Sequence, residues 1–171
     1  MPAACMPNHL APTRPHPQLR QLDYLIGTFD CDGEVLATPF STRHPMKRTL
    51  TSKLDLDGHW LFMRIDDVTT AEHPRPIRGN WQITFDQAED RFVSLWADNL
   101  GRWALQTSAG WEGDSVAFVG DALVNGKPGA VRDTLTRRSA DEMHFLVEFQ
   151  IDGVWTRYLE STCRRRKSTD S

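Results

Sequence analysis

The sequence has no run of apolar residues long enough to cross a bilayer as a helix, which takes about 20 residues. It also has no excess of positive charge. Its 171 residues carry a formal net charge of -3, whereas nucleic-acid binding favours a basic surface. The one basic run, residues 164–167, stands near the C-terminus and is interpreted as a solubilising tail. We therefore expect neither a membrane nor a nucleic acid as a partner.

Cysteine is scarce, and the three cysteines, Cys5, Cys31 and Cys163, show no Cys-x-x-Cys spacing. An odd and widely spaced set fits a reducing compartment better than a disulfide framework. Residues 1–17 also lack the apolar segment of a signal peptide. We therefore expect a cytoplasmic protein. Cys31 and Cys163 nevertheless fall on the first and last predicted strands, which would be neighbours in a closed barrel and could pair under oxidation.

The common motifs of catalysis and cofactor binding are missing. There is no Gly-x-Ser-x-Gly, no P-loop, and no Gly-x-Gly-x-x-Gly between a strand and a helix. The six histidines show neither His-x-x-x-His nor His-x-His spacing, so the pattern does not indicate metal or haem ligands. We expect no cofactor and no metal site.

Turn-forming residues recur at intervals of about ten residues, which is typical of a β-sandwich or a β-barrel. The predicted strands are residues 28–37, 46–56, 59–68, 78–86, 91–98, 102–109, 115–123, 130–138, 143–151 and 154–163. Only residues 17–25 favour a helix, with a proline at its start and Gly27 after its end.

These elements predict an all-β fold, a single antiparallel up-and-down β-barrel of about ten strands with a short N-terminal helix capping one end. Closure would remove the exposed edges that an open sheet leaves. A β-sandwich is the alternative. The predicted organisation is a flexible, proline-rich arm over residues 1–17, the barrel over 18–165, and a disordered polar tail over 166–171.

Two Asp-Gly turns predict which residues share a face, because a two-residue turn fixes the pairing of its strands. The turn at 57–58 pairs Leu54 with Leu61, Ser52 with Met63, Leu50 with Ile65, and Arg48 with Asp67, all facing inward. The turn at 152–153 pairs Phe149 with Thr156, Val147 with Tyr158, and Phe145 with Glu160, also inward. Glu148 and Arg157 should form a cross-strand ion pair on the outer face.

The sequence is rich in tryptophan, with six residues of this type. They either fill the core or line a pocket that stacks a flat ligand. The predicted ligand-binding residues are Arg48, Ser52, Met63, Asp67, Trp81, Trp96, Trp103, Phe145, Phe149, Tyr158 and Glu160. If the protein is an enzyme, Glu160 would be the acid–base group and Tyr158 a hydrogen-bond donor. Either residue could instead be structural, Glu160 as half of a salt bridge.

Trp60 and Phe62 fall on the outer face of the third predicted strand. Large exposed aromatics side by side usually mark a contact surface. We therefore expect a homodimer through this face, the alternative being that the N-terminal arm covers it.

Several segments together resemble bacterial lipocalin-like, calycin-type barrels of largely unknown function. The segment Leu22-x-x-Leu25-x-Gly27-Thr28-Phe29 is similar to their helix-to-strand entrance, with Phe29 where they usually have Trp. The other matching segments are residues 56–61, 79–86, 108–111, 131–134 and 152–155 with Glu160 after them. The resemblance covers roughly residues 19–165 and implies a ten-stranded barrel with an internal cavity. It does not imply one activity, since similar barrels carry lipids, bind haem or act as cyclases.

The leading hypothesis is a protein that binds a small hydrophobic or amphipathic molecule inside the barrel. The alternative is a cofactor-independent cyclase or isomerase of natural-product biosynthesis, which would shape a flexible substrate by confinement. A third hypothesis is an interaction module with a filled interior.

Overall fold

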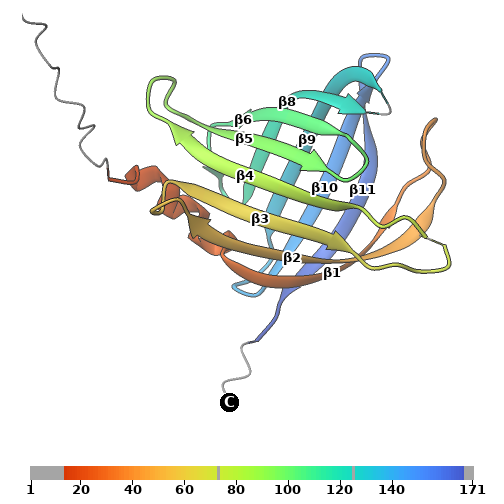
Figure 1. The fold of residues 1–171 in the computed structure, drawn as a ribbon, viewed down its shortest axis with the longest axis horizontal. Helices are drawn as coiled ribbons and strands as arrows, with labels where there is room; N and C mark the ends of the chain where they lie inside the picture. Colours follow the sequence, from red (N-terminus) through yellow and green to blue (C-terminus); the bar gives the residue numbers. More distant parts are fainter. Residues whose placement is uncertain (1–13, 73, 125, 168–171) are drawn as a thin grey trace, which may run out of the picture.

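The computed structural model describes residues 14–72, 74–124 and 126–167, which form one antiparallel β-barrel with a short 3₁₀ helix at one end (Figure 1). The elements are η1 (Pro17–Leu25), β1 (Gly27–Val35), β2 (His44–Asp55), β3 (Trp60–Asp67), β4 (Arg78–Asp86), β5 (Arg91–Asp98), β6 (Trp103–Ser108), β7 (Trp111–Glu112), β8 (Ser115–Val124), β9 (Lys127–Arg137), β10 (Glu142–Ile151) and β11 (Val154–Arg165). The arm predicted over residues 1–17 lies mostly outside the described residues, as does most of the tail.

Two pairings close the barrel. The strands follow the order β6-β5-β4-β3-β2-β1-β11-β10-β9-β8, so the first strand pairs with the last, and β6 also pairs with β8. The two-residue β7 is an addition beside β8. The predicted ten-stranded barrel is therefore confirmed, and the alternative of two packed sheets is excluded because the sheet has no break.

The helix η1 closes one end, which we call the base. Leu19, Leu22 and Leu25 repeat every three residues, the period of a 3₁₀ helix, and all three are buried in the core. The helix ends at Leu25, and Gly27 then takes a φ of 120°, a conformation that favours glycine. The short capping helix predicted from the sequence is confirmed.

The first Asp-Gly hairpin has the predicted register. Leu54 pairs with Leu61, Ser52 with Met63, Leu50 with Ile65, and Arg48 with Asp67. The turn residues Asp57 and Gly58 have φ values of 58° and 84°, which suit a tight hairpin between right-twisted strands. Alternation then carries the inward face along both strands except at Leu54, which was predicted to face inward but is 38% exposed beside the turn.

The second hairpin begins as predicted and then departs from the prediction. Phe149 pairs with Thr156 and Glu148 with Arg157 in the backbone register. The predicted ion pair of Glu148 with Arg157 is wrong, because Glu148 is buried and pairs with Arg132 at 2.6 Å. A β-bulge then follows on β11. Tyr158 is the extra residue, so Val147 pairs with Leu159. A bulge shifts the later part of its strand by one residue, which moves each side chain to the other face.

The predicted inward pairs of Val147 with Tyr158 and of Phe145 with Glu160 are therefore wrong. Phe145 instead pairs with Ser161, and both are buried.

The cysteines of the first and last strands also differ from expectation. Cys31 and Cys163 are direct cross-strand partners in β1 and β11 and form a disulfide, so the expectation of free thiols is wrong for this pair. The bond joins residues 132 positions apart at the seam where the barrel closes.

Among the described residues, no helix is long and apolar enough to cross a membrane.

Candidate functional site: a cavity at the barrel mouth

A cavity of about 70 Å³ is lined by residues near the ends of β8 and β10, at the end of the barrel opposite η1, which we call the mouth. Trp103 lines the cavity and is also 40% exposed, so the cavity reaches the surface beside β6. The apolar lining residues are Ile65, Ile77, Trp81, Trp96, Trp103, Ala104, Ala122, Leu123, Val131, Phe145, Val147, Phe149 and Leu159. The polar lining residues are Arg48, Arg102, Asp133 and Tyr158.

Aromatic rings form much of the wall. Trp81 packs edge-on against Phe118 at 5.0 Å between ring centroids and lies nearly parallel to Phe145 at 6.2 Å. Trp96 lies directly over Gly79, where any Cβ would collide with the indole ring. Gly79 is thus needed for the position of Trp96. Trp81 has an indole N–H that is buried without an acceptor among the described residues.

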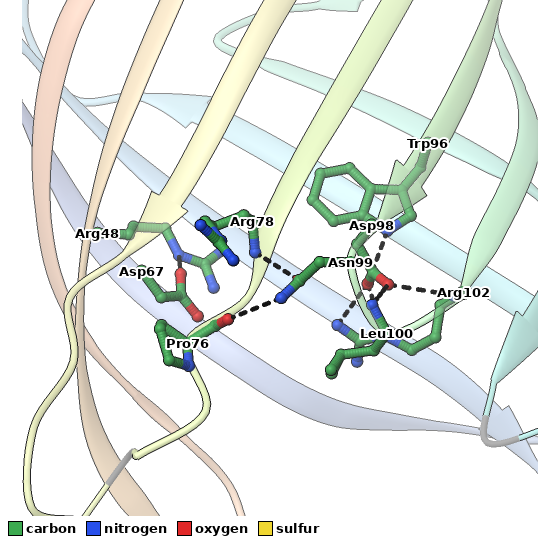
Figure 2. Close-up of polar contacts among 9 residues, drawn as sticks. All are labelled: Arg48, Asp67, Pro76, Arg78, Trp96, Asp98, Asn99, Leu100 and Arg102. Atoms are coloured by element: carbon green, nitrogen blue, oxygen red, sulfur yellow. Dashed lines mark hydrogen bonds and ion pairs between the residues drawn. The ribbon is translucent and has the colours of Figure 1, made fainter.

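A buried ion pair holds one side of the mouth. Arg48 Nε lies 2.9 Å from Asp67 Oδ1, and the side chains are only 5% and 1% exposed (Figure 2). The two residues are cross-strand partners on the inner face of β2 and β3. Because both charges are removed from water, either one would be costly without the other.

A second buried carboxylate organises the turn between β5 and β6. Asp98, whose side chain is fully buried, accepts from the backbone N–H groups of Leu100 and Arg102, and its Oδ2 lies 2.6 Å from Arg102 Nε. Trp96 Nε1 also donates to Asp98, at 3.4 Å (Figure 2). The turn therefore fixes the orientation of both Trp96 and Arg102 at the cavity.

Arg102 also lies near Tyr158 of β11 in the cavity lining. Burial acts to lower the pKa of Arg102, but Tyr158 and Asp98 outweigh it and the pKa is raised. Arg102 is therefore a cation at all accessible pH values, held between a carboxylate and a phenol.

Asn99 connects two loops of the mouth. Its Nδ2 donates to the carbonyl of Pro76 at 3.2 Å, and its Oδ1 accepts from the backbone N–H of Arg78 at 2.8 Å (Figure 2). These two hydrogen bonds connect the loop after β3 to the turn after β5.

Asp133 of β9 is the third carboxyl group near the cavity. Gln106 Nε2 donates to its Oδ2 at 2.5 Å, and Gln106 is held in turn by the Phe118 carbonyl and Ser94. Burial raises the pKa of Asp133 to about 6, although Gln106 and the charge of Arg48 act to lower it. In the folded protein, Gln106 and Arg48 therefore do not fully offset the cost of burying the ionised form of Asp133.

Seven of the residues predicted to bind ligand line this cavity, namely Arg48, Trp81, Trp96, Trp103, Phe145, Phe149 and Tyr158. That they contact a ligand stays a prediction. Three others lie beneath or beside the cavity. Ser52 hydrogen-bonds the carbonyl of Leu25, Met63 is core, and Asp67 pairs with Arg48.

Glu160 is on the other side of the wall. It lies in an outer groove with Glu34 and His144 and pairs with Arg157 at 3.5 Å. The bulge at Tyr158 is the reason, since it turns Glu160 outward while Tyr158 still faces the cavity. The structure thus does not bring the two predicted catalytic residues together.

The sequence reasoning missed Asp133, Gln106 and Arg102. The signal for Asp133 was present, because Val131, Asp133 and Leu135 alternate on one face of β9, and the two flanking residues are buried. A carboxyl group between inward apolar residues is itself a sign of a buried site.

Trp60 and Phe62 lie on the outer face as predicted, and both are half-buried there. Phe62 packs between the strand positions of Lys53 and Gln82. The homodimer through this face stays a prediction.

Among the described residues, no three His, Cys, Asp or Glu side chains are arranged to hold a metal ion.

Comparison with known protein families shows which family the chain belongs to. The family described as "Protein of unknown function (DUF1579)" matches residues 11–165. The protein belongs to the DUF1579 family. No curated protein matches the sequence. The barrel implied by the resemblance to lipocalin-like proteins is confirmed, whereas membership of the calycins stays a prediction.

Two solved structures match the chain to different degrees. The crystal structure of Rv2717c from M. tuberculosis matches with a TM-score of 0.71 at 12% identity, covering 90% of this chain and 99% of that one. A de novo designed fluorescence-activating β-barrel matches with a TM-score of 0.44 at 14% identity, covering 84% and 95% of the two chains. At such identities, the likeness to Rv2717c supports the fold alone.

Proposed function

We propose that this DUF1579 protein binds a small amphipathic molecule inside the barrel, at the mouth. The observation that carries the proposal is the carboxyl group of Asp133, which lines a largely aromatic and aliphatic cavity, together with Arg48, Arg102 and Tyr158, at a cost to its ionised form. Perturbed ionisable groups in apolar pockets are characteristic of functional sites. A protein selected only for stability would gain from a neutral or apolar residue there.

The aromatic walls supply the affinity in this proposal. Trp81 and Trp96 line the cavity, and offset aromatic pairs contribute about 0.5–1.5 kcal/mol beyond their buried area. The indole N–H of Trp81 has no acceptor among the described residues, so a ligand can accept a hydrogen bond from it. Leaving a buried donor without an acceptor costs about 1–3 kcal/mol.

The size of the cavity limits the ligand. About 70 Å³ is well below the roughly 300–1,000 Å³ of drug-sized pockets, so the closed form has room for one small ring or a chain end. A larger molecule must displace mouth side chains. Phe40, in the loop between β1 and β2, packs 5.7 Å from Phe149 and 6.1 Å from Tyr158 and is 37% exposed, so it is the side chain best placed to swing away.

The experiment is a titration with 2-phenylethanol, followed by tryptophan fluorescence and calorimetry. The wild-type protein should bind it saturably. Ala122→Leu, which fills the cavity from β8, should weaken binding at least about tenfold, or about 1.4 kcal/mol.

The matched control is Ala117→Leu, an exposed position on the outer face of the same strand, which should leave binding unchanged. Equal binding by the two variants would show that the ligand site lies elsewhere.

A further inference from the structure

The charges around the cavity do not balance. Two carboxylates, Asp67 and Asp98, are each in contact with a guanidinium, at 2.9 Å from Arg48 and 2.6 Å from Arg102. Asp133 is a third carboxyl group, and it lines the cavity without a cation of its own. The described groups thus place three acids against two bases.

The hydrogen bonds of Asp133 are also incomplete. Gln106 is its hydrogen-bond donor, at one oxygen, whereas an ionised carboxylate can accept about four hydrogen bonds. Asp133 keeps some accessible surface although it sits deep in the barrel, and that surface faces the cavity it lines. A molecule that enters the cavity can therefore reach a carboxyl group with acceptor capacity beyond its hydrogen bond from Gln106.

Arg48 compensates Asp133 only in part, because its ion pair within 4 Å is with Asp67. It attracts Asp133 across the barrel, but its Nε is already directed at Asp67. Burial still dominates the ionisation of Asp133 with Arg48 in place. An extra positive charge near Asp133 would therefore be stabilised, and an extra negative charge would be repelled.

We propose that the polar end of the ligand is a basic nitrogen that donates to the Asp133 carboxylate, while its apolar part packs on Trp81 and Trp96. This rests on the proposed function and names its ligand class as small hydrophobic amines. A charge-assisted hydrogen bond of this kind is shorter and about twice as strong as a neutral one.

Three probes that share one carbon skeleton test the proposal, namely phenethylamine (cationic at neutral pH), 2-phenylethanol (neutral) and phenylacetate (anionic). Calorimetric titration of the wild-type protein at about pH 7.5, above the pKa of Asp133, should rank amine above alcohol above carboxylate. We expect the amine to bind at least about tenfold more tightly than the alcohol, equivalent to about 1.4 kcal/mol. This ranking needs no variant.

The variant Asp133→Asn tests whether Asp133 is the residue that binds the amine. It should remove most of the amine's advantage and change the affinity for 2-phenylethanol by less than about twofold, because the shape of the site is kept. The control is Asp121→Asn, an exposed carboxylate on the neighbouring strand β8, which should keep the wild-type ranking.

The possible failures are distinguishable. Binding of 2-phenylethanol with no preference for the amine, or with a preference for phenylacetate, would overturn this inference and leave the interior site standing. An amine preference that survives Asp133→Asn would also overturn it. Absence of saturable binding by all three probes would overturn the proposed function as well.

Discussion

The base and the mouth of this barrel are closed by different kinds of interaction. At the base, η1 inserts three buried leucines, and Arg165 donates to the carbonyls of Tyr24 and Ile26 at 2.7 and 2.6 Å while stacking 4.4 Å from the ring of Phe29. Trp111 Nε1 donates to the carbonyl of Gln21 at 2.7 Å. The end of the helix is thus packed and hydrogen-bonded.

The mouth instead buries charge. Asp67, Asp98 and Asp133 lie around a cavity that is not filled, and Asp133 is not fully compensated. The base follows the rules for stability, whereas the mouth departs from them at specific residues. Such local departures are expected at functional sites rather than in structural cores.

The strongest way to test the mouth is to remove the cation of its buried ion pair between Arg48 and Asp67. Arg48→Met keeps the apolar stem and removes the partner of Asp67, so we expect a loss of about 3–5 kcal/mol in the free energy of unfolding by urea. The control is Arg64→Met, whose pair with Asp66 on the outer face is about half exposed and should matter by less than about 1 kcal/mol. Equal effects of the two changes would mean that Asp67 is not truly desolvated.

The base should respond to lost packing instead. Leu22 is completely buried in η1, and Leu22→Ala should cost about 3 kcal/mol in the same urea experiment. Because the cavity lies at the other end, the affinity for 2-phenylethanol should stay within about twofold of wild type. A large loss of affinity would show that the two ends are coupled.

Asp133 predicts a pH dependence of the protein's stability that is not expected from the residues at the base of the barrel. Its pKa is about 6 when folded and 3.8 ordinarily, so the folded protein holds this proton more tightly than the unfolded chain. Its contribution to stability is therefore greatest below about pH 4 and is lost as the pH rises to about 6. A shift of this size corresponds to about 3 kcal/mol.

Asp133→Asn removes that dependence. The stability of the variant relative to wild type should rise by up to about 3 kcal/mol between about pH 4 and about pH 7, measured by urea unfolding at both values. In Asp121→Asn the same difference should not change with pH. A pH-independent difference for Asp133→Asn as well would mean that the carboxyl group is solvated.

The smallest effect on stability is expected at Phe40, beside the mouth. Phe40→Ala removes a partly exposed ring that covers Phe149 and Tyr158, so stability should change by less than about 1 kcal/mol. Stopped-flow fluorescence should show faster association and dissociation of 2-phenylethanol, because the ring no longer covers the entrance. Unchanged rates would place the entrance elsewhere on the mouth.

The barrel itself was predictable because its signals are local. The Asp57-Gly58 turn and the alternation along β2 and β3 fix the inward pairs Leu50–Ile65 and Arg48–Asp67 without any knowledge of the rest of the chain. The same logic failed on β11. Nothing in the residues around Tyr158 announces a bulge, which depends on how β11 fits both β10 and β1 when the barrel closes.

The candidate site was partly predictable for the same reason. Trp81, Trp96 and Phe145 were among the predicted ligand-binding residues, and they line the cavity. Arg102 and Asp98 were not, because their role comes from a turn whose side chains fold back on the backbone. Which inward residues surround empty space, and which fill it, depends on packing across the barrel.

The most direct test of the central claim is to locate a bound molecule by nuclear Overhauser contacts. With 2-phenylethanol at saturation, its ring protons should show contacts to the indole protons of Trp81 and Trp96 in the cavity. Trp155, which stacks under Arg132 at 4.6 Å on the outer wall, should show none. Contacts to Trp155 without contacts to Trp81 and Trp96 would contradict an interior binding site.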